Sequence, residues 1–314
     1  MRPKIGLALG GGGARGYAHI GVIRTLLAHG IPIDMIAGTS MGAAVGAVYG
    51  CGKDMSWFEK VLKNLDLNRL LGIPDTPIKS FENFASTAAS ELLFKKADWR
   101  HHEPEKVKLL HNFLMIFSNN RDISELGIPF AAVACDVDTG EQVVLKAGKV
   151  HKAVAASMAM PGLQQPVHHE GRFLIDGGLV NKIPIEVAVE LGADIVIAVD
   201  VSAALSNQVN TSIDVLVQAQ AILSNELARM KLEAMRERLG ERLIVLHPAV
   251  DRIKIYSLRQ VEPPIQAGTN ATLGKIDLIK TTIEKLSTTA SRESTLRAPA
   301  ELHQEAHAHP TVTS

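Results

Sequence analysis

The sequence predicts an α/β fold in which helices cover a mostly parallel β-sheet, and two observations support this class. Residues 4–49 alternate between strand and helix patterns, the order typical of parallel strands joined by crossover helices. Ile195–Val199 is a run of mainly β-branched apolar residues, as expected of a strand buried on both faces. The chain has 314 residues, 46% of them apolar, which is enough to bury a sizeable core.

Apolar periodicity, together with glycine and proline stops, predicts the elements of the first half of the chain. They are a strand at 4–9, a glycine loop at 10–16, a helix at 17–29, a strand at 33–37, a helix from 43 to 49, helices at 54–65 and 104–118, strands at Phe130–Asp136 and 142–146, and a helix at 150–159. The turn Asp138-Thr139-Gly140 joins the later two strands and predicts a hairpin.

The second half continues the alternation and ends in a helix. Its predicted elements are a strand at 173–175, a helix at 183–191, strands at Ile195–Val199 and Leu243–Leu246, and helices at Ser212–Leu239 and 275–286. The long helix Ser212–Leu239, which Gly240 can cap, is expected to be amphipathic with one apolar face. The residues of that face are Ile213, Leu216, Val217, Leu223, Leu227, Met230 and Met235.

Residues 1–287 are interpreted as one domain and 288–314 as a flexible tail, because the tail has no aromatic residue and no apolar periodicity. His303, His307 and His309 lie in this tail. A solvated tail is favoured over a metal site there.

Composition narrows the function classes. The formal net charge of zero argues against a nucleic-acid-binding protein, which is usually basic. Two cysteines, Cys51 and Cys135, cannot form a disulfide framework, and their spacing fits no zinc site. Residues 35–52 carry no charge and approach the length of a membrane span, but their glycines favour a buried strand, turn and helix. No secretory signal is recognised, so a cytoplasmic location is expected.

The first candidate motif is the glycine loop, where Gly11, Gly13 and Gly16 lie between a strand and a helix. Glycines allow close backbone approach, and successive N–H groups at a helix start can point at one negative oxygen. The pattern fits a dinucleotide site, an oxyanion hole or a simple turn. A dinucleotide site needs an acidic residue at the end of the second strand. Asp34 lies at the start of that strand, which disfavours a nucleotide.

The second motif is G-x-S-x-G at residues 38–42, after a strand and before a helix of small residues. This context is that of a nucleophile elbow, a sharp turn expected to hold Ser40 exposed at its apex. Gly38 and Gly42 relieve crowding where strand and helix nearly touch. The helix N-terminus favours negative charge that develops near Ser40.

A serine hydroxyl needs a base, and the chain offers two candidates. Asp200 and His247 follow successive strands, and with Ser40 they would give the chain order of an α/β-hydrolase triad. Against this, Ser40 follows only the second strand. Asp176 is the alternative, directly after a short strand and before two glycines. If it meets Ser40 within hydrogen-bond reach, it can take the proton without a histidine.

Three ordered motifs together resemble the patatin-like phospholipase family, and within it the bacterial members related to the esterase domain of neuropathy target esterase. They are G-G-G-x-R-G at residues 11–16, G-x-S-x-G at residues 38–42, and D-G-[AG] at Asp176, Gly177 and Gly178. The resemblance extends through residues 156–162 and 181–184 and covers roughly residues 4–285.

The resemblance implies a three-layer α/β/α sandwich and a Ser–Asp dyad without metal or other cofactor. Ser40 would be the nucleophile and Asp176 the base, with an oxyanion hole from Gly11, Gly12 and Gly13 and with Arg15 at the loop. Gly16, Gly38, Gly42, Gly177 and Gly178 would support these motifs. The implied reaction is hydrolysis of ester bonds in acyl lipids. An acyltransferase on the same dyad and a catalytically idle regulator remain alternatives, and the oligomeric state is left open.

The segment at 72–100 is unusually rich in aromatic residues for a chain with 4% of them. It contains Phe81, Phe84, Leu92, Leu93, Phe94 and Trp99, with Lys95, Lys96 and Arg100 beside them. These residues suit a lid or an interface helix on anionic lipid at the inner membrane surface. Packing in the core is the plainer interpretation of the same residues.

Overall fold

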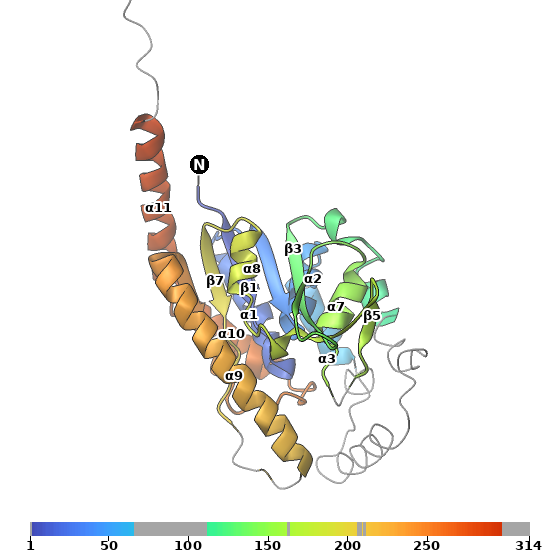
Figure 1. The fold of residues 1–314 in the computed structure, drawn as a ribbon. Helices are drawn as coiled ribbons and strands as arrows, with labels where there is room; N and C mark the ends of the chain where they lie inside the picture. Colours follow the sequence, from blue (N-terminus) through green and yellow to red (C-terminus); the bar gives the residue numbers. More distant parts are fainter. Residues whose placement is uncertain (1, 66–111, 162–163, 206–208, 210–211, 297–314) are drawn as a thin grey trace, which may run out of the picture.

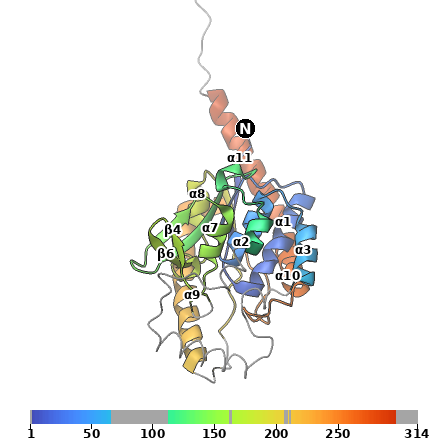
Figure 2. The same cartoon turned by 90° about the vertical axis from the view of Figure 1, so that its right-hand side faces the viewer.

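The computed structural model describes residues 2–65, 112–161, 164–205, 209 and 212–296 (Figures 1 and 2). Its centre is an eight-stranded sheet in the order β5-β6-β3-β2-β1-β7-β8, with β4 paired to β3. The strands are β1 (Ile5–Leu9), β2 (Met35–Thr39), β3 (Phe130–Asp136), β4 (Gln142–Leu145), β5 (Val167–His169), β6 (Arg172–Asp176), β7 (Ile195–Val199) and β8 (Leu243–Leu246). The five adjacent strands β3, β2, β1, β7 and β8 are parallel to one another. Strands β4 and β6 pair antiparallel with β3, and β5 pairs antiparallel with β6. The predicted mostly parallel sheet is confirmed.

Helices cover both faces of this sheet, which gives three layers (Figures 1 and 2). The α-helices are α1 (Ala18–Ala28), α2 (Met41–Gly50), α3 (Met55–Asn64), α7 (Val150–Ser157), α8 (Ile185–Glu190), α9 (Ser212–Leu239), α10 (Glu262–Leu273) and α11 (Ile276–Leu296). Short 3-10 turns are η1 (Gly13–Tyr17), η3 (Ile123–Glu125), η4 (Gly177–Leu179) and η5 (Gly240–Arg242). One face carries α1, α2 and α7, with α10 packed outside α1, and the other carries α8 and α9.

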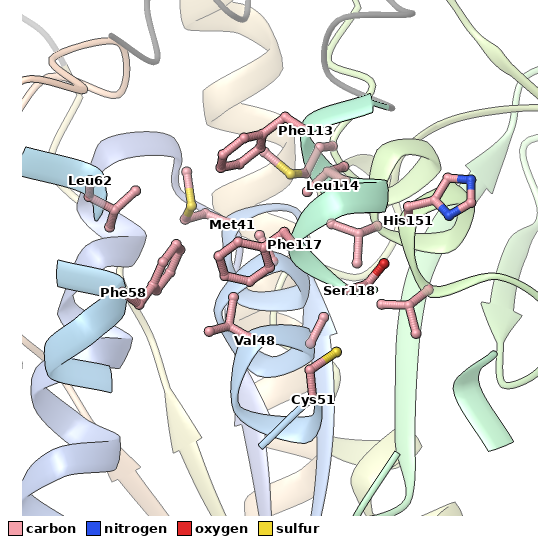
Figure 3. Close-up of a pocket in the computed structure, with 15 residues that line it drawn as sticks. Met41, Val48, Cys51, Phe58, Leu62, Phe113, Leu114, Phe117, Ser118 and His151 are labelled. Atoms are coloured by element: carbon pink, nitrogen blue, oxygen red, sulfur yellow. The ribbon is translucent and has the colours of Figure 1, made fainter. Parts of the chain in front are cut away.

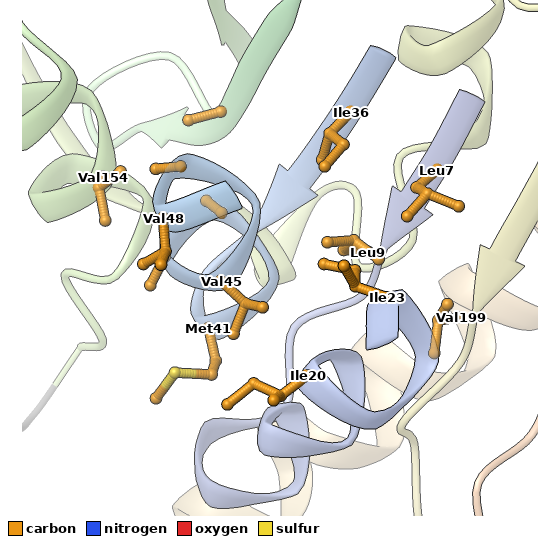
Figure 4. Close-up of a cluster of buried hydrophobic side chains, with 14 of the residues drawn as sticks. Leu7, Leu9, Ile20, Ile23, Ile36, Met41, Val45, Val48, Val154 and Val199 are labelled. Carbon is orange, nitrogen blue, oxygen red and sulfur yellow. The ribbon is translucent and has the colours of Figure 1, made fainter. Parts of the chain in front are cut away.

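The two faces of the sheet differ in the size of their side chains. Leu7 and Leu9 of β1 point into the larger core with Ile20 and Ile23 of α1 (Figure 4). The opposite face of β1 presents Gly6 and Ala8 instead. A Cβ atom on Gly6 would lie 2.6 Å from the Cβ of Ala193, so small residues here allow the α8 layer to approach the backbone closely. Close packing on this face holds α8 and the residues directly after it against β1.

Most predicted elements are confirmed, and the differences have local reasons. Residues 35–52 form β2, a turn and α2, and none of the described helices is long and apolar enough to span a bilayer. The helix predicted at 104–118 is seen at 112–117, and its earlier residues lie outside the described residues. The segment 72–100 and residues 297–314 also lie outside them.

Two helices differ from the prediction. No helix was expected at α10, where Pro263 and Pro264 follow Glu262, but proline is tolerated in the first turn of a helix. The last helix was expected to end at residue 286, but α11 continues to Leu296. The residues after 286 are polar, and apolar periodicity cannot reveal a polar helical end.

The apolar face predicted for α9 is only partly right. Met235 is buried, with Ala228, Leu232 and Leu239, whereas Leu223 is 72% exposed and Met230 57% exposed. Because the helix carries apolar residues on more than one side, the sequence pattern did not reveal which side packs on the sheet.

Candidate active site

Ser40 lies at the turn between β2 and α2 in a backbone conformation that is rare for a side-chain-bearing residue. Its φ is 53° and its ψ is −122°. Such a conformation costs on the order of 1–3 kcal/mol and is found at functional sites. Gly38 and Gly42 permit the turn, because a Cβ on Gly38 would lie 2.6 Å from the Ala43 backbone and one on Gly42 would clash with the Leu9 carbonyl. The geometry is that of a nucleophile elbow.

The elbow is enclosed, which differs from the exposed apex that was expected. Ser40 is only 7% exposed, because the glycine loop, α7 and the end of β6 surround it. Its backbone N–H donates to Ser157 Oγ at 2.8 Å, and that hydroxyl donates to the Val133 carbonyl at 2.5 Å. Ser157, which is fully buried, therefore anchors the strained turn to β3.

Asp176 ends β6 and is brought to Ser40. Gly177 makes this possible, because the chain passes so close to the Val133 carbonyl that a Cβ would clash. The Asp176 carboxyl is 6% exposed, and its Oδ1 accepts the Gly178 N–H at 2.7 Å. Oδ2 has no hydrogen bond of standard geometry to any described residue. The Ser40 hydroxyl lowers the pKa of this carboxyl as a hydrogen-bond donor does.

Burial sets the acidity of this carboxyl. It raises the pKa of Asp176 to about 6, since the charged form is poorly solvated. The Ser40 hydroxyl, the Gly178 N–H and the positive charge of Lys182 lower the pKa, but together they only partly offset burial. A carboxylate with a pKa near 6 is a better proton acceptor than an ordinary aspartate and is still ionised at neutral pH.

The glycine loop lies beside the elbow, since a Cβ on Gly11 would be 3.3 Å from the Cβ of Ser40. The Gly11 N–H donates to the Lys182 carbonyl at 3.0 Å and is therefore engaged. Within the described chain, the N–H groups of Gly12 and Gly13 donate to no backbone carbonyl outside the helices and strands. Gly13 adopts a φ of 55°, which favours glycine, and packs against the Ile255 carbonyl. Of the three predicted donors, the structure thus engages Gly11 with another backbone carbonyl.

Arg15 and His19 support the loop from behind. The Arg15 Nε donates to the Ile253 carbonyl at 2.7 Å. His19 is fully buried, and its Nε2 lies 2.7 Å from the Gly10 carbonyl. Burial lowers the pKa of His19 to about 4, so the ring is neutral and donates to that carbonyl. The motifs in the sequence do not predict this role, although a histidine among apolar helix residues is a signal of it.

Lys182 is a second residue that the sequence did not single out. Its carbonyl holds Gly11, and its Nζ donates to Asn225 Oδ1 on α9 at 2.5 Å. Burial lowers the pKa of Lys182 to about 8, and the charges of Asp200 and Asp176 oppose this shift. The amine is thus a buried cation that acts on the Asp176 carboxyl.

The alternative base pair lies at the other end of the sheet. His247 Nδ1 is 3.4 Å from Asp200 Oδ2, but the His247 side chain is 55% exposed. Their strands β7 and β8 are two and three positions from β2, and strand spacings of about 4.8 Å place His247 roughly 14 Å from the elbow. The structure thus brings Asp176, and not His247, to Ser40.

An apolar cavity of about 40 Å³ opens next to the elbow (Figure 3). It is lined by Met41, which follows Ser40, and by Val48, Phe58, Phe117, Val154 and Met158. The Phe58 and Phe117 rings pack with centroids 5.1 Å apart and form part of its wall. Among the described residues, no group of three or more His, Cys, Asp or Glu side chains is arranged to hold a metal.

The sequence model of the patatin-like phospholipase family matches residues 7–189, which include the glycine loop, the elbow and Asp176. The chain belongs to the patatin-like phospholipase family. This membership agrees with the resemblance carried by the three motifs.

Several curated relatives are similar to about two thirds of this patatin-like chain. An uncharacterized NTE family protein of Mycobacterium tuberculosis is 36% identical over 206 residues, which are 64% of this chain and 49% of that protein. Patatin-like phospholipase domain-containing protein 7 of Rattus norvegicus is 32% identical over 207 residues, 63% of this chain and 13% of the relative. Lysophospholipase NTE1 of Mycosarcoma maydis is 35% identical over 202 residues, 63% of this chain and 10% of the relative. The match thus spans about half of the mycobacterial relative and about a tenth of the other two.

Solved structures agree on the fold. VipD from Legionella pneumophila superposes with a TM-score of 0.51 at 15% identity, over 90% of this chain and 67% of that one. Human GIVD cytosolic phospholipase A2 gives a TM-score of 0.51 at 11% identity, over 90% of this chain and 60% of that one. At these identities the similarity concerns the fold alone.

Proposed function

We propose that this patatin-like protein hydrolyses ester bonds of acyl lipids with Ser40 as nucleophile and Asp176 as base. The observation that carries the proposal is the buried Asp176 carboxyl, whose pKa is raised to about 6 and which faces the hydroxyl of a strained elbow serine. A serine is activated when an adjacent base can accept its proton. Membership of a family named for phospholipases supports the substrate class.

In the first step the Ser40 oxygen attacks the ester carbonyl carbon while its proton passes to Asp176. Negative charge develops on the carbonyl oxygen, and in this proposal the Gly12 and Gly13 amides stabilise it. One such donor is typically worth about 2.7–4 kcal/mol. The tetrahedral intermediate then collapses, the C–O bond to the alcohol breaks, and the alcohol takes the proton from Asp176. An acyl-enzyme on Ser40 remains.

In the second step Asp176 accepts a proton from water, and the resulting hydroxide attacks the acyl carbon. The acid leaves when the bond to Ser40 breaks, and Asp176 returns the proton to the Ser40 oxygen. The apolar cavity that Met41 lines supports this substrate class, because it offers an apolar contact for the first part of an acyl chain near the elbow. The head-group and chain-length preferences depend on parts of the site beyond this cavity.

The test is a panel of p-nitrophenyl esters of short to long acyl chains, and of lysophospholipids, against wild type and Ser40→Ala. The proposal expects wild-type turnover and a loss of at least about 10³-fold in Ser40→Ala with the fold intact by circular dichroism. A fluorophosphonate should label wild type and not Ser40→Ala. Equal labelling of both, or turnover that survives in Ser40→Ala, would refute the assignment.

Two alternatives give different outcomes in the same assays. A catalytically idle regulator would leave the fluorophosphonate unreacted in wild type. An acyltransferase would form an acyl ester with an added alcohol at the expense of free fatty acid. Ser40, Asp176 and the glycine loop favour a working nucleophile, and the choice of acceptor is decided by product analysis.

A further inference from the structure

The first half of α9 presents apolar side chains to solvent. Val215 is 55% exposed, Ile222 46% and Leu223 72%. The residues of α9 that are buried all lie later in the helix, among those whose side chains are described; they are Ala228, Leu232, Met235 and Leu239. The helix therefore packs on the sheet with its second half and exposes apolar groups from its first half.

Charge divides α9 at the same place. Residues 215–225 contain no charged side chain. The following part of the helix contains seven, which are Glu226, Arg229, Lys231, Glu233, Arg236, Glu237 and Arg238. Moving an uncharged run of side chains out of water costs little free energy, whereas moving the charged side chains of the second half out of water costs much more.

The uncharged half lies at the site. Asn225, at its end, accepts the hydrogen bond from Lys182, whose carbonyl holds the glycine loop at Gly11. The helix also packs against η4, the turn directly after Asp176. In Figures 1 and 2 the N-terminal end of α9 projects past the ends of the parallel strands. The exposed apolar side chains thus lie beyond the strand ends at which Ser40 also lies.

A second segment extends this surface. The Ala203 carbonyl accepts from Asn225 Nδ2 at 3.5 Å, and the Ala204 N–H donates to Asp251 Oδ1 at 3.0 Å, which link α9 to the loop 251–256. That loop carries exposed Lys254, whose Nζ lies 5.9 Å from the ring centroid of Tyr256. Its Ile255 carbonyl accepts the Ala14 N–H, so the loop borders the glycine loop.

We propose that Val215, Ile222 and Leu223 of α9, together with Leu205, Lys254 and Tyr256, form a membrane surface that seats the enzyme on an anionic phospholipid bilayer. Leu205 is 45% exposed and Tyr256 41%. Apolar side chains with an aromatic ring and a cation beside them are the composition that binds the headgroup region. This inference rests on the proposed function in one respect: hydrolysis of lipid at Ser40 is the reason for the protein to contact a membrane.

A second copy of the chain is a less suitable occupant. Helix-to-helix pairing would run along α9 and would also cover exposed Met230, which lies among Glu226, Arg229 and Glu233. These charges already pair within the helix. A bilayer needs only the uncharged run at residues 215–225, which follows Asp214 in the part of the helix that projects.

The test measures co-sedimentation of Ser40→Ala protein with vesicles of phosphatidylcholine and phosphatidylglycerol, so that the lipid is not consumed. In that background Ile222→Asp/Leu223→Asp should lower the bound fraction so that the partition coefficient falls about tenfold or more. Leu273→Asp/Leu278→Asp is the matched control. These residues are 45% and 48% exposed on α10 and α11, and the change should leave binding as it is.

Activity separates this inference from the proposed function. In the wild-type background, Ile222→Asp/Leu223→Asp should hydrolyse a monomeric p-nitrophenyl ester at the wild-type rate, which also shows that it folds, and should lose activity on vesicle substrate. Vesicle binding equal to that of the control, or a loss of dimer by light scattering in place of a loss of binding, would overturn the membrane surface. Absence of ester hydrolysis in wild type would overturn the proposed function and leave the binding result to stand by itself.

Discussion

Two aspartates that each lie at the end of a strand, on opposite sides of β2 in the sheet, meet opposite environments. Asp200, after β7, accepts hydrogen bonds from His247 and Ser202, and these outweigh burial and lower its pKa to about 2. Asp176, at the end of β6, has one oxygen bound by the Gly178 N–H and the other without a hydrogen bond of standard geometry to any described residue, and burial raises its pKa to about 6. The ionised Asp200 carboxylate is stabilised by its partners and stays deprotonated. The Asp176 carboxylate has fewer partners, so its charge destabilises the folded state and it accepts a proton more readily.

Activity gives the largest expected difference between the two carboxylates. Asp176→Asn should lower kcat/KM by about 10²–10⁴-fold, since an amide cannot accept the Ser40 proton. Asp200→Asn and His247→Ala should lower it less than about threefold, because both residues lie at strands two and three positions from β2 and do not exchange a proton with Ser40. The measurement is kcat/KM on a soluble ester for all three variants. A larger loss of kcat/KM in His247→Ala than in Asp176→Asn would make His247, and not Asp176, the base.

The free energy of unfolding extends the same comparison. Asp176→Asn and Asp200→Asn should change it in opposite directions at pH 7. The folded pKa of Asp176, about 6 against an ordinary 3.8, is raised, so wild type loses stability as pH rises from about 4 to 6. Asp176→Asn removes this penalty and should gain up to about 3 kcal/mol above pH 6, from a shift of about two units. The gain should shrink at pH 4.

The folded pKa of Asp200 is depressed, so its contribution is present above pH 4 and is lost as pH falls toward 2. Asp200→Asn should therefore destabilise the protein at pH 7. Urea unfolding of both variants at pH 7 and pH 4.5 measures the two signs. Destabilisation by Asp176→Asn at pH 7 would mean that the carboxylate has a partner that offsets its burial.

Ser157 tests whether the elbow needs its anchor. Ser157→Ala leaves the Ser40 N–H and the Val133 carbonyl without their shared partner and should cost about 1–3 kcal/mol in unfolding free energy. Misplacement of the nucleophile should also lower kcat, on the order of tenfold. Ser118→Ala is a control at a buried serine that bonds within its own helical turn. Equal effects of the two substitutions would remove the special role of Ser157.

The motif pattern predicted much of this site, because local sequence dictates local geometry. Glycines on both sides of Ser40 predict the elbow, and the position of Asp176 before two glycines predicts a carboxylate on a tight turn. The contributions of Ser157, His19 and Lys182 depend on tertiary contacts between distant segments, which periodicity does not reveal. The polar Ser157 in a helix of alanines and valines was a signal, whereas Lys182 gave none. The inward side of α9 was missed because both of its sides carry apolar residues.

Lys182 should have the smallest effect, confined to pH dependence. Its positive charge lowers the pKa of Asp176, so Lys182→Met should move the acid limb of kcat/KM to higher pH. Activity at pH 6 should fall a few-fold while activity at pH 8 changes little, since Asp176 is ionised there in both proteins. Lys231→Met, at an ion pair with Glu186 farther from the site, is the control. An unmoved limb would show that the two groups do not interact.

The most direct test of the account is the pH profile of kcat/KM in the His247→Ala variant, with a soluble ester as substrate. His247 and Asp176 are the two candidate bases, and removal of the His247 side chain leaves Asp176 as the one whose titration the profile reports. The account predicts that the variant keeps near wild-type activity and an acid limb with a midpoint at about pH 6, which belongs to Asp176. Loss of that limb, or of the activity itself, would contradict a base at Asp176.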